Sequence, residues 1–451
     1  MKIVIIGLGT MGETVLGSLE GEGHTVTLID EDEQVVSRLI EKYDVAGVVG
    51  NGACMDIQRE AGVKGADLLV ALTFSDEMNI LCCLVAKHLG VKNTVARVRN
   101  PDYSSQIIAM KDELGISMVV NPEKETAKEI FNLISLPSIA QIDQFAKGKV
   151  SLVEIVAEQS CALVGETLIS LGKKLTSKVL ICAVQRGGEV IIPDGHFMIE
   201  ENDRIYFTAE ACVLGDFLSE VNLVKSPIKS VMIAGGGRTS YYLADMLSSK
   251  KYRVKIIEKD HKEAERLAEL LPRATVLEGN ATQHDILLEE GIESVDAFVA
   301  LTDGDEANML MSMFAAKKQV RKPITLIQSD DLYDMLGEVG IQNNVSPKNI
   351  VSGSILSYIR ALANKRGSNV LTLYRLVGNR VEALEFVAKK KEYFYDKPLK
   401  ELKTKDNSLI ASIIRGAEVL IPDGNTCIKM GDTVIVVTTH KNFDDLNDLF
   451  E

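Results

Sequence analysis

The sequence predicts an α/β protein with two Rossmann-like, doubly wound parallel-sheet domains, each followed by a small α+β domain. Three observations indicate this class: a glycine-rich turn between an apolar run and a helix-period segment, strands that alternate with helices, and a second copy of the whole pattern 225 to 229 residues further on. Alternating strands and helices of this length form a parallel sheet covered on both faces. The repeat indicates an internal duplication in the order N-domain, C-domain, N-domain, C-domain.

The first element is the stretch MKIVIIGLGTMG, in which an apolar run leads into the pattern GxGxxG. Gly7 permits the turn, Gly9 lets a phosphate approach the backbone, and Gly12 lets the next helix pack closely. The N-terminus of that helix presents N–H groups to a pyrophosphate. The second predicted strand ends in Asp30, 18 residues after Gly12, where an acid accepts hydrogen bonds from a ribose diol. The pattern predicts an adenine-dinucleotide site.

The rest of the first domain continues the alternation of strands and helices. We expect helices at residues 33–41, 58–61, 76–89 and 101–114, and strands at 45–49, 68–72, 94–98 and 119–120. Asn51-Gly52 and Thr73-Phe74 follow the third and fourth strands, so we expect them to border the adenosine at the carboxyl edge of the sheet. Arg97 or Arg99 is either a phosphate ligand or an ordinary surface charge.

From about residue 150 the pattern changes to short strands and turns. Residues 179–185 and 189–192 flank Arg186-Gly187-Gly188, which predicts a hairpin. A strand at 204–207 and an apolar helix near 213–218 complete a small α+β module.

The second copy departs from the first at several candidate site positions. Ser240 replaces the third glycine, Glu258 replaces Asp30, and the strand at 324–328 lacks an arginine. Arg238 lies within the turn, where it favours extra negative charge. We expect this site to bind a different nucleotide, to bind more weakly, or to have become structural.

The duplication also sets the expected domain limits. Residues 123–136 and 348–362 are amphipathic and are either crossover helices between neighbouring domains or ordinary core-facing helices. The expected segments are 1–122 (N-domain), 123–142 (crossover helix or linker), 143–224 (C-domain), 228–347 (second N-domain), 348–367 (second crossover helix or linker) and 368–451 (second C-domain).

Composition argues against two classes of protein, those that bind nucleic acid and those that span a membrane. The net charge of −14 argues against a nucleic-acid partner, and no apolar run approaches the roughly 18 residues that a membrane span needs. A strand that begins at residue 2 indicates no signal peptide. The seven cysteines lack disulfide or metal-ligand spacing, so we expect small buried hydrophobes in a cytoplasmic protein with no metal site.

Candidate catalytic residues are sparse. None of the six histidines recurs in the second copy, and His196, after the Pro-Asp-Gly turn, matches Asn425. Since hydride transfer needs a proton-transferring group opposite the nicotinamide, the pattern favours a nucleotide sensor without catalytic residues. An NAD-dependent oxidoreductase is the alternative. A third possibility is that the small modules bind their own ligand, such as a cyclic dinucleotide.

The motifs GLGTMG…LID, GNG, ALT and ARVRNP, with the two segments RGGEVIIPDG and RGAEVLIPDG, give the whole chain a specific resemblance. It resembles the TrkA family of Trk-system potassium uptake regulators, which is built from tandem RCK (KTN) N- and C-domains. The resemblance implies a protein peripheral to the inner face of the membrane, a homotetrameric ring beneath a TrkH/TrkG-type potassium channel subunit, and NAD+/NADH and ATP/ADP as ligands.

Motif and resemblance together give the candidate nucleotide-binding residues. They are Gly7, Leu8, Gly9, Thr10, Met11, Gly12, Asp30, Asn51, Gly52, Thr73, Phe74 and Arg97 in the first copy, and Gly235, Gly236, Gly237, Arg238, Thr239, Glu258, Asn280, Ala281 and Thr302 in the second.

Overall fold

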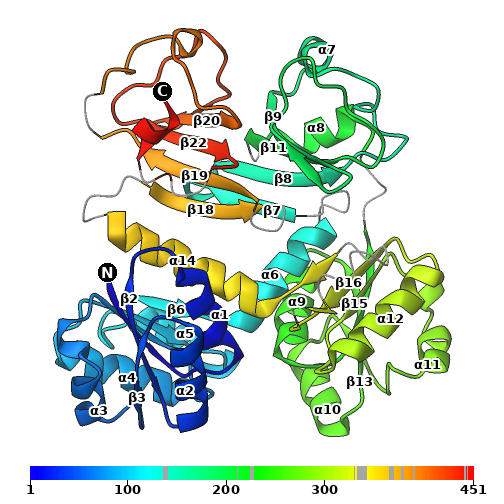
Figure 1. Cartoon of the computed structure of the whole chain (residues 1–451). Coiled ribbons are helices and arrows are strands. Elements are labelled where there is room, and N and C mark those ends of the chain that lie inside the picture. The colour runs from blue at the N-terminus through cyan, green and yellow to red at the C-terminus, as the bar shows by residue number, and fades with distance from the viewer. Residues whose placement is uncertain are drawn as a thin grey trace. The chain divides into compact units, whose positions relative to one another are not determined.

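Two compact units make up the chain, and each combines both halves of the sequence: Met1–Ile134 with Ile228–Ile359, and Ser135–Pro227 with Arg360–Glu451. The first unit contains two parallel sheets and the second two antiparallel sheets (Figure 1). The predicted fold class is therefore confirmed. The structure, a computed structural model, describes residues 1–135, 141–210, 212–223, 228–329, 331–332, 343–364, 370–376, 380–389, 392–440, 443 and 445–450. The predicted ends of the two linkers, at 136–142 and 365–367, lie wholly or partly outside these residues.

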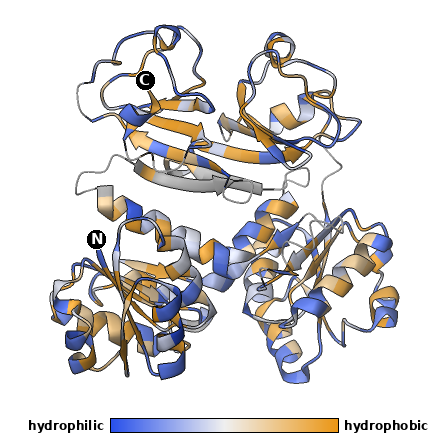
Figure 2. Cartoon of the chain, viewed as in Figure 1, coloured by the Kyte–Doolittle hydropathy of each residue, from blue (hydrophilic) through white to orange (hydrophobic). Residues whose placement is uncertain are grey.

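The first N-domain has the strand order β3-β2-β1-β4-β5-β6, with every pair parallel. This order reverses beside β1, the position where doubly wound sheets bind ligands. Hydrophobic residues gather on the strands, and hydrophilic ones lie on the outer faces of the helices (Figure 2). Its elements are β1 (Lys2–Ile6), α1 (Thr10–Leu19), β2 (Thr25–Asp30), α2 (Glu33–Lys42), β3 (Ala46–Val49), α3 (Met55–Glu60), β4 (Leu68–Ala71), α4 (Asp76–His88), β5 (Asn93–Arg97), α5 (Pro101–Met110), β6 (Met118–Val120) and α6 (Pro122–Ser135).

The second N-domain repeats this topology in the order β14-β13-β12-β15-β16-β17. Helix caps recur as well: Asp32 caps α2 by accepting from Gln34 N, and Asp260 caps α10 by accepting from Glu263 N. Its elements are β12 (Ser230–Ala234), α9 (Arg238–Ser249), β13 (Arg253–Glu258), α10 (His261–Leu270), β14 (Thr275–Glu278), α11 (His284–Glu289), β15 (Ala297–Ala300), α12 (Asp305–Lys317), β16 (Lys322–Leu326), β17 (Asn344–Val345) and α14 (Pro347–Asn364).

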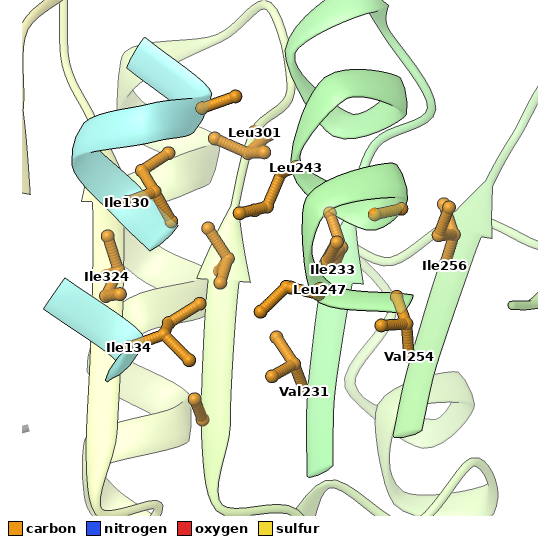
Figure 3. Close-up of a cluster of buried hydrophobic side chains, with 14 of the residues drawn as sticks. Ile130, Ile134, Val231, Ile233, Leu243, Leu247, Val254, Ile256, Leu301 and Ile324 are labelled. Atoms are coloured by element: carbon orange, nitrogen blue, oxygen red, sulfur yellow. The ribbon is translucent and has the colours of Figure 1, made fainter. Parts of the chain in front are cut away.

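Helix α6 follows the first N-domain along the chain but packs into the core of the second. Ile130 and Ile134 are buried against Leu301 and Ile324 of the second domain (Figure 3). Helix α14 contacts the first domain in turn, because Ser352 Oγ lies 2.7 Å from Ser18 Oγ on α1. Helix α6 therefore packs against the N-domain that follows it in the sequence.

The C-domains are antiparallel sheets with the matching orders β10-β9-β11-β8-β7 and β21-β20-β22-β19-β18. One face of each sheet contributes to a shared apolar core, in which Phe145, Leu152 and Tyr206 meet Ala383 and Ile435. The elements are β7 (Gln141–Phe145), β8 (Val150–Val156), α7 (Leu168–Lys174), β9 (Val179–Arg186), β10 (Glu189–Ile191), β11 (Arg204–Glu210), α8 (Leu214–Glu220), β18 (Val370–Leu376), β19 (Val381–Val387), β20 (Ser408–Arg415), β21 (Glu418–Leu420) and β22 (Thr433–Thr438).

The predicted hairpin is present: Arg186 pairs with Glu189 across Gly187 and Gly188, both of which have positive φ. Several expectations need correction. Helix α5 ends at Met110 rather than 114, because Ile116 N donates to Lys111 O across a turn that includes left-handed Gly115. Strand β7 and helix α7 were not predicted.

Among the cysteines, Cys82, Cys83, Cys161 and Cys182 are buried as expected, whereas Cys54 and Cys212 are exposed. No helix among the described residues has both the length and the apolar character of a membrane span.

Candidate functional site

The three glycines of the first turn differ in the space that surrounds them. Gly7 has φ +88°, and a Cβ there would lie 2.6 Å from Thr73 N. A Cβ at Gly12 would lie 2.1 Å from Gly7 O, so only glycine allows this approach of helix and turn. A Cβ at Gly9 would have no neighbouring atom of the described residues within 4 Å, so the backbone there is open to a ligand. Helix α1 begins at Thr10 and has no side-chain cap, which leaves its first N–H groups available to an anion.

The acid at the end of the second strand fixes the turn. Asp30 Oδ2 accepts from Leu8 N at 2.6 Å, and Oδ1 accepts from Asp32 N at 3.0 Å. A carboxylate has about four lone-pair sites, so two remain for a ribose diol.

The second turn retains this architecture with compensating changes. Glu258 accepts from Gly236 N and, at 2.8 Å, from Asp260 N. Gly236 stands where the first copy has Leu8, and a Cβ there would lie 2.8 Å from Glu258 Cγ. Glycine therefore makes room for the extra methylene of the glutamate. Gly235, with φ +102°, repeats Gly7, while Gly237 caps α9, which includes Thr239.

The loops after the third strands show a second compensation. A Cβ at Gly52 would lie 2.2 Å from Ile6 Cγ2, whereas its counterpart Ala281 fits because Ala234 replaces Ile6. Asn51 and Asn280 each hold their own loop by accepting from a backbone N–H two residues ahead. We call the carboxyl edge of the first parallel sheet, at Gly7, Asp30 and Thr73, the first cleft, and the matching edge at Gly235, Glu258 and Thr302 the second cleft.

The fourth strands end in a hydrogen-bond network that sequence reasoning missed. Asn79 Oδ1 accepts from both Thr73 N and Thr73 Oγ1 at 2.8 Å, and its Nδ2 donates to Arg97 O at 2.9 Å. The network recurs with Asn308, Thr302 and Leu326. Both asparagines are fully buried. The repeated Asp-Glu-x-Asn at the start of the following helices was the signal that could have revealed them.

A cluster of charges lies where the two N-domains meet. Arg99 forms ion pairs with Asp76 (Nε–Oδ1 3.7 Å) and Glu123 (Nη1–Oε1 4.0 Å). Burial lowers the pKa of Arg97, as do the nearby charges of Arg99 and Arg238. Burial raises the pKa of Glu123, although the charges of Arg97, Arg99 and Arg238 act to lower it. Arg238, predicted as part of the second site, begins helix α9, and the Tyr242 hydroxyl of that helix donates to Arg99 O at 3.3 Å.

Two polar atoms of this cluster, Arg97 Nε and Glu123 Oε2, are buried without a hydrogen-bond partner among the described residues. Such atoms are costly unless a ligand or water satisfies them. Phe74, beside the cluster, is 81% exposed. An open glycine turn, an acid at the ribose position and arginines short of partners fit an adenine nucleotide.

Comparison with known proteins shows the family to which the chain belongs. The TrkA-N domain model matches residues 3–122 and 231–347, and the TrkA-C domain model matches residues 152–224 and 383–451. The chain is 32% identical over 456 residues to the Trk system potassium uptake protein TrkA of Vibrio alginolyticus, covering 100% of this chain and 99% of that protein. The chain belongs to the TrkA family.

Other TrkA-family relatives agree in length. TrkA homolog 1 of Methanosarcina mazei is 33% identical over 445 residues, with 97% of each chain covered. The GsuK channel has the same fold at 17% identity, with a TM-score of 0.65 and coverage of 98% of this chain and 77% of that one. Solved structures of GsuK include one bound to NAD (TM-score 0.64) and one bound to ADP (TM-score 0.51).

The contrast between Gly12 and Ser240 gives a testable prediction. Ser240 is fully buried and its hydroxyl lacks a partner among the described residues. Gly12→Ser should push α1 away from Gly7 O, with an overpacking cost of about 1–3 kcal/mol and at least a roughly tenfold loss of nucleotide affinity in the first cleft. Thermal melting and calorimetric titration measure both effects. Ser240→Gly is the matched control and should leave both unchanged; equal effects of the two substitutions would contradict the prediction.

No group of three or more His, Cys, Asp and Glu side chains in the described part of the chain has the arrangement of a metal site. His196 lies on an exposed loop whose Asp194 accepts from the His196 backbone N–H.

Proposed function

We propose that the chain is the cytoplasmic, nucleotide-binding regulatory subunit of a Trk-type potassium uptake system. Binding of NAD(H), ATP or ADP changes the arrangement of the N-domains and so opens or closes the pore of a TrkH/TrkG-type channel subunit. The observation that carries this proposal is the charge cluster of the first N-domain, where Arg97 Nε is buried without a hydrogen-bond partner among the described residues and the hydroxyl of Tyr242 from the second N-domain donates to Arg99 O. A ligand there contacts two domains that α6 also joins.

The proposal is of a sensor that performs no turnover. Hydride transfer needs a proton-transferring group opposite the nicotinamide, and the histidine nearest to such a role lies on an exposed loop of a C-domain. The carboxylates Asp30 and Glu258 are instead occupied by backbone N–H groups of the turns. Such a site binds and orients a nucleotide.

We further propose that the chain assembles as a homotetrameric ring at the inner face of the membrane. Both N-domains expose a pair of apolar residues at equivalent positions, Leu81 with Leu84 on α4 and Leu310 with Met313 on α12. A repeated exposed pair of this kind supports contact between copies. Moving a ring from mostly closed to mostly open needs about 5.5 kcal/mol, which four subunits supply at roughly 1–2 kcal/mol each.

The test is potassium flux through a Trk-type channel subunit reconstituted in liposomes with the purified chain. Addition of nucleotide should change the flux by roughly fivefold or more, and a chain carrying both Asp30→Ala and Glu258→Ala should give no response. A flux that ignores nucleotides which the chain demonstrably binds would refute the proposal. Turnover of NADH under the same conditions would favour an oxidoreductase.

A further inference from the structure

Each C-domain has a loop face made of chain segments that lie side by side, and backbone hydrogen bonds fix which positions of the two faces correspond. These bonds run from Ala157 N to Asp203 O and Gly165 N to Ile199 O in the first domain, and from Ala388 N to Asp432 O and Asp396 N to Ile428 O in the second. We call residues 157–169 with 196–203 the C1 face, and residues 388–389 and 392–400 with 425–432 the C2 face.

The sign of the charge is reversed at three matched positions of these faces. The glutamates of the C1 face and the lysines that replace them on the C2 face are Glu158 and Lys389, Glu166 and Lys397, and Glu200 and Lys429. A fourth acid of the C1 face, Glu201, is matched by the apolar Met430. All three lysines are exposed, as are three of the four glutamates; Glu166 is half-buried.

The C1 face keeps an excess of negative charge after its own ion pairs are counted. Glu166 Oε1 pairs with Lys174 Nζ at 2.5 Å. Arg186 binds Glu200 through Nη1 at 2.7 Å, but its Nε and Nη2 bind Asp203 at 2.8 and 2.7 Å. One guanidinium thus serves two carboxylates, so the face remains acidic.

The C2 face has the opposite balance. Arg415, which matches Arg186, pairs with Asp432 at 2.8 Å, and a lysine stands where the C1 face has its second carboxylate. The other acids of the face are Glu392 and Asp396. They are outnumbered by lysines at positions 389, 397, 400 and 429.

Both faces also expose apolar side chains. Ile169 and Met198 of the C1 face are 44% and 52% exposed, and Tyr393 and Met430 of the C2 face are 54% and 69% exposed. Lys397 Nζ lies 5.6 Å from the centre of the Tyr393 ring, so charge and apolar surface adjoin. Exposed apolar residues with a charged rim are typical of a surface that binds another protein.

We propose that the C2 face of one copy of the chain binds the C1 face of another copy. The lysines of one face meet the glutamates of the other, which orients the two copies, and the exposed apolar side chains are buried between them. Each chain carries one face of each kind, so the contact is head-to-tail and joins copies in series. It involves C-domains alone and is separate from the exposed apolar pairs on α4 and α12.

The experiment is sedimentation velocity of the full-length chain over a range of concentrations and salt. Association through these faces should weaken between about 0.1 M and 1 M salt, where the Debye length falls from about 10 Å to 3 Å. Lys389→Glu with Lys429→Glu reverses the C2 face, and Glu158→Lys with Glu201→Lys reverses the C1 face. Each pair should weaken the association roughly tenfold or more, because attraction becomes repulsion. Lys250→Glu with Lys262→Glu makes the same charge change on exposed residues of the second N-domain and should have no effect.

Mixing the two reversed variants is the decisive measurement. The C1 face of each then meets a C2 face of opposite charge on the other, so association should return to within about threefold of the wild-type value. Failure of the mixture to associate, or a wild-type chain with no salt-sensitive association, would overturn the proposal. Nucleotide binding should be equal in all variants, so this result is independent of the proposed function.

A membrane is the other surface that a lysine-rich face with an exposed tyrosine could bind. Vesicles of phosphatidylcholine and phosphatidylglycerol in equal amounts test this, because anionic lipid attracts clustered lysines. Wild-type chain that binds these vesicles through Lys389 and Lys429, while its copies stay apart, would assign the C2 face to lipid and overturn the contact between copies.

Discussion

Asp30→Ala should abolish nucleotide binding in the first cleft. The carboxylate holds the glycine turn through Leu8 N at 2.6 Å and would accept both hydroxyls of a ribose. Each hydrogen bond to a charged group contributes about 1.5–3 kcal/mol, so the loss of two weakens binding by about 3 kcal/mol or more, which is a factor of roughly 100 or greater. Isothermal titration with ATP and NADH would show a lower stoichiometry per chain.

Two controls make this result specific. Glu31→Ala removes the same charge from the adjacent, exposed residue and should leave the binding curve unchanged. Glu258→Ala should remove only the second site, because that carboxylate holds the turn at Gly236. Unaltered stoichiometry and affinity in Asp30→Ala would show that this acid does not contact the nucleotide. Loss of binding with Asp30→Ala alone would make the second copy structural.

Ile130→Ala should destabilise the second N-domain although the residue follows the first along the chain. Ile130 is fully buried in the cluster formed by Ile233, Leu243 and Ile324 (Figure 3). Truncation of a buried isoleucine to alanine costs about 2–5 kcal/mol through lost burial and a residual cavity. Hydrogen exchange followed by mass spectrometry should show faster exchange in β12 and β15, with β1 and β4 protected as before.

The matched control for this substitution lies on the same helix. Lys128→Ala changes an exposed residue of α6 and should alter neither domain. Faster exchange confined to the first N-domain would contradict the assignment of α6 to the core of the second. Ile130→Val, which removes a single methyl group, should show the same pattern at a cost of about 0.5–1.5 kcal/mol.

Much of each cleft could be predicted from short stretches of sequence. The turn at Gly7 and Gly12 and the acid at Asp30 lie within 30 residues, and the steric limits of glycine backbones decide their geometry locally. The duplication then located the equivalent positions in the second half. Helix ends such as that of α5 and short strands such as β7 were less predictable, because tertiary contacts outweigh weak local preferences.

The replacements in the second copy needed three-dimensional contacts for their interpretation. Glu258 is accommodated by the missing side chain of Gly236, and Ala281 by the missing methylene and methyl groups at Ala234. These pairs lie 22 and 47 residues apart in the chain. The sequence shows each replacement by itself. In the close-packed interior, the larger side chain of each pair fits because its neighbour is smaller.

By itself the sequence determined the fold class, the duplicated order, the two glycine turns and their acids, since all of these follow from local backbone geometry and periodicity. Only the tertiary structure shows which N-domain is contacted by helices α6 and α9. Helix α6 completes the core of the second N-domain, and Tyr242 of α9 donates a hydrogen bond to Arg99 O of the first. Both contacts form because apolar faces of segments far apart in the chain are buried against each other. The hydrophobic effect is non-directional, so a sequence pattern shows that a face is buried but not which segment covers it.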